Sequence, residues 1–247
     1  MDAKQEKDYI YSGQMVLFGE KDVIGFGDKE FQVKEIDRVI ANNTIIKNHY
    51  SHKVYNATYI NLGVYYKDEL KGVLQYGYAM NPASQESVVS NTKIDEYLEL
   101  NRMWLDDCLG KNSESKAISY SIKYIKRKFK GKIKWVQSFA DERCGKNGIV
   151  YQACSFKYYG EHTSDFWELD GVVYHNIQMT VSPDTKRYNK EVHYLQSNKD
   201  RAVKMSLRQF RYICFIDKRW VANCLLEEKE YPKHYKEKEN ENGKENT

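Results

Sequence analysis

The stretch from residue 97 to residue 144 constrains the fold more than any other part of the chain. It opens with the mostly apolar run YLELNRMWL over Tyr97–Leu105, which predicts a strand. After a short polar turn, four apolar residues recur at spacings of four, three and four: Ile118, Ile122, Ile125 and Phe129. This spacing predicts an amphipathic helix, and Gly131 is predicted to end it. A second apolar run over 133–139 predicts a buried strand. This order of strand, turn, helix and strand indicates an α/β protein with the helix packed on a sheet.

Length and composition agree with one globular domain. The chain has 247 residues, of which 41% are hydrophobic, enough for a substantial core. No apolar run approaches the roughly 18 residues of a membrane span, and the first residues, MDAKQEKDYIY, lack the apolar centre of a signal peptide. The five cysteines are widely spaced without a CxxC pair, which favours reduced thiols and gives no zinc motif. We therefore expect a soluble, cytoplasmic protein.

The rest of the chain supplies further strands. Phe31–Glu35 alternates like a strand, and residues 37–48 predict a helix with Ile36, Val39, Ile40 and Ile46 on its apolar face. Residues 55–66 and 72–80 predict an antiparallel hairpin, residues 166–169 and 172–177 a second one turning at Asp170-Gly171, and residues 209–217 a last strand. We expect an N-terminal extension of loops or small hairpins over 1–30, a folded domain over 31–235 and a disordered polar tail over 236–247.

Two polar clusters in the central stretch are candidate functional groups. Ser113 is a predicted N-cap and Ser115 lies in the first helical turn, where backbone N–H groups and the helix dipole favour an anion. The alternative, that these serines only cap the helix, has equal weight. Asp141, Glu142 and Arg143 follow the buried strand at its carboxyl end, where ligands gather in α/β sheets. Exposed salt bridges are the structural alternative for this trio.

Positive residues cluster in two runs, although the net charge is only +4. The first covers 123–134 and the second covers 186–211, where aromatic residues are interleaved. Such runs indicate nucleic acid binding or a solvated face with about equal weight. The candidate DNA-binding residues are Lys126, Arg127, Lys186, Arg187 and Arg208.

Several blocks of sequence, in their order along the chain, resemble the Mom family of bacteriophage DNA modification proteins. They are ELNRMWL, NSES, WVQSFADERC, GIVYQACSF, QFRYICFID and Tyr231-Pro232-Lys233, within a span from about Glu35 to Lys233. The resemblance implies a GNAT-like α/β fold, with a mixed, mainly antiparallel twisted sheet flanked by helices. It also implies a transferase that places a carbamoylmethyl group on N6 of adenine in double-stranded DNA, which protects phage DNA from host restriction.

The same resemblance implies roles for seven residues. His49, Tyr50, Asp141 and Tyr151 match the family's catalytic positions, and Arg102, Ser113 and Ser115 match its donor-binding positions. Asp141 or His49 would accept the proton of the amine, the imidazole exchanging protons near neutral pH. Tyr151 would donate to a leaving group, and Tyr50 would stack on a flipped base. Without the resemblance, a lone histidine after a helix is usually structural and a tyrosine usually packs in the core.

The identity of the donor stays open. GNAT enzymes bind the coenzyme A pyrophosphate with a glycine-rich turn, whereas this turn reads Asp106-Asp107-Cys108-Leu109-Gly110-Lys111-Asn112. Its two carboxylates would repel a pyrophosphate unless a cation or Lys111 intervened, which argues against acetyl-coenzyme A. A glycine-derived donor is the alternative. A metal ion is left open, but no ligands are assigned, since His49 and His52 alone do not form a ligand set.

Two other function classes fit the residues. The order of strand, turn and helix also suits a GNAT-type acyltransferase that acts on a small-molecule or protein amine. The basic runs also suit a nucleic-acid-binding protein without catalytic activity.

Overall fold

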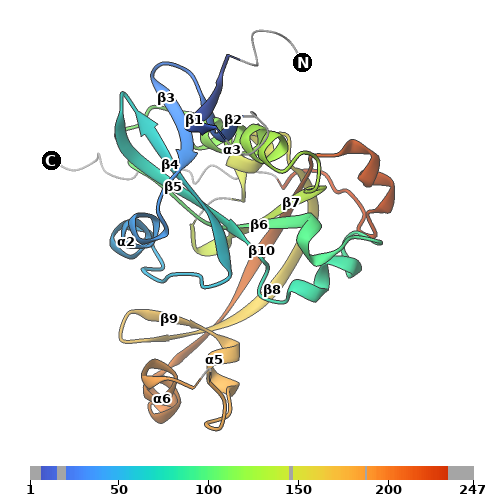
Figure 1. Cartoon of the computed structure of the whole chain (residues 1–247). Coiled ribbons are helices and arrows are strands. Elements are labelled where there is room, and N and C mark those ends of the chain that lie inside the picture. Colours follow the sequence, from blue (N-terminus) through green and yellow to red (C-terminus); the bar gives the residue numbers. More distant parts are fainter. Residues whose placement is uncertain (1–6, 16–20, 145–146, 187, 233–247) are drawn as a thin grey trace, which may run out of the picture.

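The computed structural model describes residues 7–15, 21–144, 147–186 and 188–232. Within them the chain forms a ten-stranded sheet in the order β1-β2-β3-β4-β5-β6-β7-β10-β8-β9 (Figure 1). The strands are β1 (Tyr9–Met15), β2 (Lys21–Gly27), β3 (Phe31–Glu35), β4 (Thr58–Tyr66), β5 (Glu69–Gly77), β6 (Tyr97–Leu105), β7 (Trp135–Asp141), β8 (Lys157–Leu169), β9 (Val172–His175) and β10 (Val203–Phe215). β6 and β7 are parallel, and the other neighbouring pairs are antiparallel. The predicted fold class, a mixed and mainly antiparallel sheet flanked by helices, is confirmed.

Helix α3 (Ser113–Lys128) packs on one face of the sheet, against β2 and β3. Its predicted apolar stripe is confirmed, because Ile118 and Ile125 are fully buried and the partly buried Ile122 and Phe129 pack against the same core. The predicted N-cap is wrong by one residue. Asn112, in the left-handed region with φ 69°, occupies the N-cap position, and Ser113 is the first helical residue. Asparagine tolerates that backbone region better than most residues, which explains why the helix begins there.

The opposite face of the sheet has its own apolar cluster, which includes Tyr97, Trp135, Ile213 and Phe215. The rings of Tyr97 and Trp135 stack with centroids 4.7 Å apart. Short 3₁₀ segments and the chain around them cover this cluster: η1 (Pro82–Ser87), η2 (Ile94–Glu96) and η5 (Lys218–Asn223). The sheet is therefore buried on both faces where β6, β7 and β10 lie side by side.

Helix α2 (Arg38–Asn48) confirms the predicted helix but not its predicted apolar face. Ala41 and Ile45 are the buried residues, and they pack with Val73 of β5. Val39, Ile40 and Ile46 are exposed, at 64%, 48% and 48%. The prediction failed because the helix buries a narrow stripe of two residues four positions apart, and the other β-branched residues are left at the surface.

Strands β8 and β10 continue beyond the rest of the sheet as a long antiparallel ribbon (Figure 1). The end of the ribbon carries β9, α5 (Asn176–Thr180) and α6 (Lys190–Ser197), and we call this part the arm. The arm has a small core of its own around Leu169, Tyr174 and Leu195. The predicted turn at Asp170-Gly171 is confirmed, with positive φ at both residues. No helix in the described part of the chain is long and apolar enough to cross a membrane.

Candidate active site

The candidate active site lies where the two parallel strands separate. β6 pairs with β7 only from Tyr97 to Glu99 and from Trp135 to Gln137. Beyond these residues the strand ends line a pocket of about 400 Å³, together with the start of α3, α4 (Ile149–Ala153) and the residues after α2. Separating strands leave side chains and backbone groups without a neighbouring strand to pair with. This is the place in the sheet where a ligand can reach them.

The pocket gathers six of the seven residues predicted as catalytic or donor-binding. These six are His49, Tyr50, Arg102, Ser115, Asp141 and Tyr151. They come from five segments that are far apart in the sequence, and only the fold brings them together. Ser113 is the exception, because it lines a different pocket.

His49 is held in a fixed orientation at the end of α2. Its backbone N–H closes the helix on the carbonyl of Ile45 at 3.0 Å, and its side chain is 6% exposed. The backbone N–H of Ser51 donates to Nδ1 at 3.1 Å, so a neutral imidazole must carry its proton on Nε2. Burial, with Arg102, His52 and Arg143 nearby, lowers the pKa of His49 to about 4. The prediction that this imidazole exchanges protons near neutral pH is therefore wrong, and His49 is a neutral hydrogen-bond donor.

The low pKa of His49 makes the stability of the protein depend on pH. Above pH 6.5 the imidazole is neutral in both the folded and the unfolded chain. Between pH 6.5 and about 4 the unfolded chain binds a proton that the folded chain excludes, so stability falls as the pH falls. We expect a loss of up to about 3 kcal/mol in urea unfolding, absent in His49→Gln. A His193→Gln variant, which changes an exposed histidine of α6 outside the pocket, should keep the wild-type slope. The wild-type slope in His49→Gln would contradict the assignment.

Asp141 ends β7 in a close ion pair with Arg143. Nε of Arg143 donates to both carboxylate oxygens, at 3.1 and 3.0 Å, Nη2 donates to Oδ2, and the backbone N–H of Arg143 donates to Oδ1 at 3.0 Å. Asp141 is 8% exposed. Arg143 also lies over the rings of Tyr50, at 5.5 Å, and Phe166, at 4.7 Å. It connects the candidate carboxylate to the strand that leads to the arm, a role that spacing in the sequence did not indicate.

The two tyrosines differ in exposure. Tyr50 lines the pocket and is 53% exposed, with its ring 4.3 Å from that of His49. Tyr151 of α4 is buried, with its ring 5.3 Å from Tyr212. Tyr50 can therefore stack on a planar group that enters from solvent, whereas Tyr151 can act only on a group inside the pocket.

Gly148 allows α4 to approach the sheet. It has φ +81°, and a Cβ atom there would collide with the ring of Tyr212, whose hydroxyl donates to the carbonyl of Asn147. We expect Gly148→Ala to destabilise the protein by about 1–3 kcal/mol in urea unfolding and to displace Tyr151. Gly171→Ala is the matched control, because Gly171 has φ +75° with open space around it. Equal losses in the two variants would show that only backbone strain matters.

The predicted donor-binding residues are partly engaged with the backbone. Arg102 donates from Nε to the carbonyl of Lys53 at 3.3 Å and from Nη1 to that of Asn101 at 2.7 Å, so it holds the loop after His49 on β6. The hydroxyl of Ser115 donates to the carbonyl of Asn112 at 2.9 Å, which leaves its oxygen free to accept. In the described part of the chain, no three His, Cys, Asp or Glu side chains are grouped as metal ligands.

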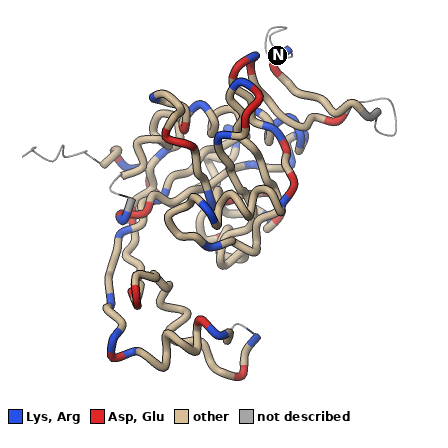
Figure 2. Tube along the Cα trace, turned by 90° about the vertical axis from the view of Figure 1, so that its left-hand side faces the viewer, with Lys and Arg blue, Asp and Glu red and all other residues tan. Residues whose placement is uncertain are grey.

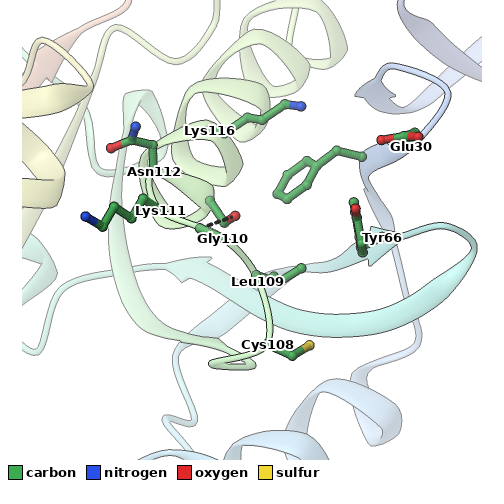
Figure 3. Close-up of a pocket in the computed structure, with 10 residues that line it drawn as sticks. Glu30, Tyr66, Cys108, Leu109, Gly110, Lys111, Asn112 and Lys116 are labelled. Atoms are coloured by element: carbon green, nitrogen blue, oxygen red, sulfur yellow. Dashed lines mark hydrogen bonds between the residues drawn. The ribbon is translucent and has the colours of Figure 1, made fainter.

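Ser113 faces a second pocket, of about 290 Å³, on the other side of the turn before α3. Figure 3 shows Gly110, Lys111 and Asn112 on the turn and Tyr66 and Glu30 across from it. The hydroxyl of Ser113 donates to the carbonyl of Gly110 at 2.7 Å. The two serines of the NSES block thus face different pockets.

The predicted DNA-binding residues do not form one surface. Lys126 and Arg127 lie near the end of α3, about 17 Å along the helix from Ser115. Lys186 is exposed in the arm, and Arg187 lies outside the described residues. Arg208 of β10 donates to Glu142, at 2.9 Å from Nε. Acidic and basic residues alternate along the arm in Figure 2, and Arg201 and Lys204 pair with Asp170 and Asp165, so the second run is not a continuous basic surface.

The fold and the pocket define an α/β protein whose candidate active site lies between diverging parallel strands. The chain belongs to the Mom protein family, whose model matches residues 30–233. It is 46% identical over 216 residues to the methylcarbamoylase Mom of Escherichia phage Mu, and the matched region covers 87% of this chain and 88% of that relative.

Solved structures of similar shape are acetyltransferases. A ribosomal-protein-S5-alanine acetyltransferase from Vibrio fischeri has a TM-score of 0.46 and 12% identity, over 80% of this chain and 98% of that one. An acetyltransferase from Salmonella typhimurium that modifies the N-terminal serine of ribosomal protein L7/L12 has a TM-score of 0.43 and 10% identity, over 77% and 97%.

Proposed function

We propose that this protein is a DNA modification enzyme that transfers a carbamoylmethyl group to N6 of adenine in double-stranded phage DNA. The observation that carries the proposal is the gathering of His49, Tyr50, Asp141 and Tyr151 in one pocket of a chain that belongs to the Mom family. The phage Mu relative is a methylcarbamoylase, which supports the transfer of a small group that contains an amide.

The pocket contains the groups that this chemistry needs. The target base must leave the duplex for its N6 amine to reach a protein side chain, and Tyr50 offers an exposed ring on which it can stack. Asp141 would take the N6 proton, which requires Arg143 to give up part of its contact with the carboxylate when the base enters. The N6–C bond then forms as the bond between that carbon and its leaving group breaks.

His49 and Tyr151 would act on the donor rather than on the base. The neutral His49 presents Nε2–H, which can stabilise negative charge as it develops on the donor. Tyr151, inside the pocket, would give a proton to the leaving group. The donor would approach from the start of α3, where Ser115 lies. A glycine-derived donor has the two carbons and the nitrogen of the carbamoylmethyl group, whereas the acetyl group of acetyl-coenzyme A has no nitrogen to supply.

Nucleoside mass spectrometry on DNA from cells that express the protein tests this proposal. The expected result is a derivative of deoxyadenosine with an added carbamoylmethyl group. Unmodified adenine in the presence of soluble, folded protein would refute it. Donor turnover with a free amine, but not with DNA, would favour an acyltransferase for small molecules or proteins instead.

A further inference from the structure

A buried glutamine beside the active site has an oxygen without a partner. Gln137 of β7 is 4% exposed, and its Nε2 donates to Glu99 at 2.8 Å. Its Oε1 is buried and accepts no hydrogen bond from any described residue. A buried acceptor without a donor costs free energy, so such groups usually belong to a site for a ligand or for ordered water.

A guanidinium with unused donors lies on the neighbouring strand. Arg211 of β10 is partly buried, and its guanidinium forms no hydrogen bond or ion pair with any described residue. It is opposite Phe139 in the β10–β7 register, and its guanidinium lies 5.2 Å from the centre of that ring. Alternation along the strands places Arg211, Gln137 and Glu99 on the same face of the sheet.

Glu99 completes this cluster on β6. Its carboxylate accepts from Gln137 and, at 3.1 Å, from Nδ2 of Asn101, which lines the active-site pocket. Burial raises the pKa of Glu99 to about 7, against the opposing effect of those hydrogen bonds and of Arg211. Glu99 and Gln137 are also the last parallel pair before β6 and β7 separate. The cluster therefore lies where the gap between the two strands begins.

Two other glutamines, Gln75 and Gln85, also have an unpartnered Oε1 among the described residues. Each is paired through Nε2, Gln75 with Asn42 and Asn61 and Gln85 with the carbonyl of Thr92. Gln75 is opposite Arg102 in the β5–β6 register, but that guanidinium donates to the carbonyls of Lys53 and Asn101. Among the described residues, Gln137 differs from the other two glutamines because the guanidinium on its neighbouring strand, that of Arg211, has no side-chain hydrogen bond, and because Phe139 beside it lines the active-site pocket.

We infer that Gln137, Glu99 and Arg211 bind the nitrogen-bearing end of the two-carbon group that the enzyme transfers, an amide or an amine next to a carbonyl. This inference rests on the proposed function and names the residues that select the group. The free Oε1 accepts an N–H, and Arg211 donates to the carbonyl oxygen. A phosphate would fit poorly, because it has no N–H to offer and would meet the carboxylate of Glu99.

The spacing along β7 suits a group of this size. Gln137 lies four residues from Asp141 on the same face, a separation of about 13 Å. A two-carbon unit of about 3.6 Å with a hydrogen bond of about 2.9 Å at each end covers about 9 Å, and the Gln137 side chain reaches the rest. The reacting nitrogen can thus lie at Asp141 while the far end of the group lies at Gln137.

Nitrogen NMR of the side-chain amides tests the inference without DNA. The Gln137 amide signal is assigned by its loss in Gln137→Leu, and ¹⁵N-labelled protein is titrated with glycinamide, acetamide, acetate and deoxyadenosine monophosphate. We expect glycinamide or acetamide to shift the signal to saturation, with acetate inactive and Arg211→Gln weakening the binding at least tenfold. Gln85→Leu is the matched control and should bind as the wild type does.

The other outcomes overturn the inference. An equal response to acetate would indicate an anion site, a response to the nucleotide alone would indicate a base-reading site, and no response would indicate bound water only. As a second measurement, Gln137→Leu should lower kcat/KM for DNA modification by roughly tenfold to a hundredfold, with unchanged Kd for DNA. If wild-type protein leaves DNA unmodified, the proposed function fails, while the amide titration still decides whether this subsite exists.

Discussion

An Asp141→Asn variant should lose DNA modification, with kcat/KM lowered by about 10²- to 10⁴-fold. The amide of asparagine can keep a hydrogen bond with Arg143, but it cannot take the proton that leaves the N6 amine. The loss should appear in kcat, because the side chain acts in the transition state rather than in DNA binding. Modified nucleoside released from DNA, measured over time at saturating substrate, gives kcat directly.

The control for this prediction is Asp165→Asn on β8. Asp165 is a partly exposed carboxylate, at 31%, that pairs with Lys204 and accepts from Ser206, outside the pocket. The Asp165→Asn variant should modify DNA at the wild-type rate. A gel-shift measurement should give the same Kd for wild type and Asp141→Asn. Activity within tenfold of wild type in Asp141→Asn would remove Asp141 from the role of base.

The central stretch of the sequence predicted the heart of the fold because its local signals agreed with one another. Tyr97–Leu105 is a strand with the predicted bounds, and the period of the apolar residues located α3 and its buried side. Asp170 and Gly171 both have positive φ, as the dipeptide indicated. Where hydrophobic period, turn residues and strand composition indicate the same structure, the local sequence is enough to predict that structure.

The full length of the ribbon formed by β8 and β10 was not predicted, because strand pairing rather than burial stabilises much of it. β8 and β10 each run for 13 residues, but much of each is polar on both faces, so the apolar pattern indicated only residues 166–169 and 209–217. The face of α2 was wrong for a related reason, since a helix at the edge of the fold can leave several isoleucines exposed. Both errors concern exposed elements, where hydrophobic period carries little information.

The candidate site shows a different limit. Family resemblance identified six residues that the fold gathers, whereas composition and spacing alone left His49 and Tyr151 as ordinary structural residues. Sequence could not show that Ser51 holds Nδ1 of His49, or that Arg143 folds back onto Asp141. Such contacts depend on backbone geometry over a few residues. The same geometry decides whether His49 can act as a base or only as a hydrogen-bond donor.

Arg143→Leu should destabilise the protein by about 3 kcal/mol at neutral pH. The change would leave the carboxylate of Asp141, which is 8% exposed, in the pocket wall without its ion-pair partner. Asp141→Asn together with Arg143→Leu should cost less than the sum of the single changes, with a coupling of about 2 kcal/mol, because the double variant buries no unpaired charge. Urea unfolding of wild type, both single variants and the double variant measures this cycle.

The neighbouring pair of Glu142 and Arg208 is the control for the cycle, because it has similar hydrogen bonds but far more exposure. Arg208 is 49% and Glu142 is 34% exposed, against 25% for Arg143. Solvent screens an exposed pair, so the cycle of Glu142→Gln and Arg208→Leu should give a coupling below about 1 kcal/mol. Equal couplings in the two cycles would mean that Asp141 is solvated like a surface carboxylate. In that case Arg143 would not hold the carboxylate in place for the incoming base, and the proposed exchange of partners at Asp141 would lose its structural basis.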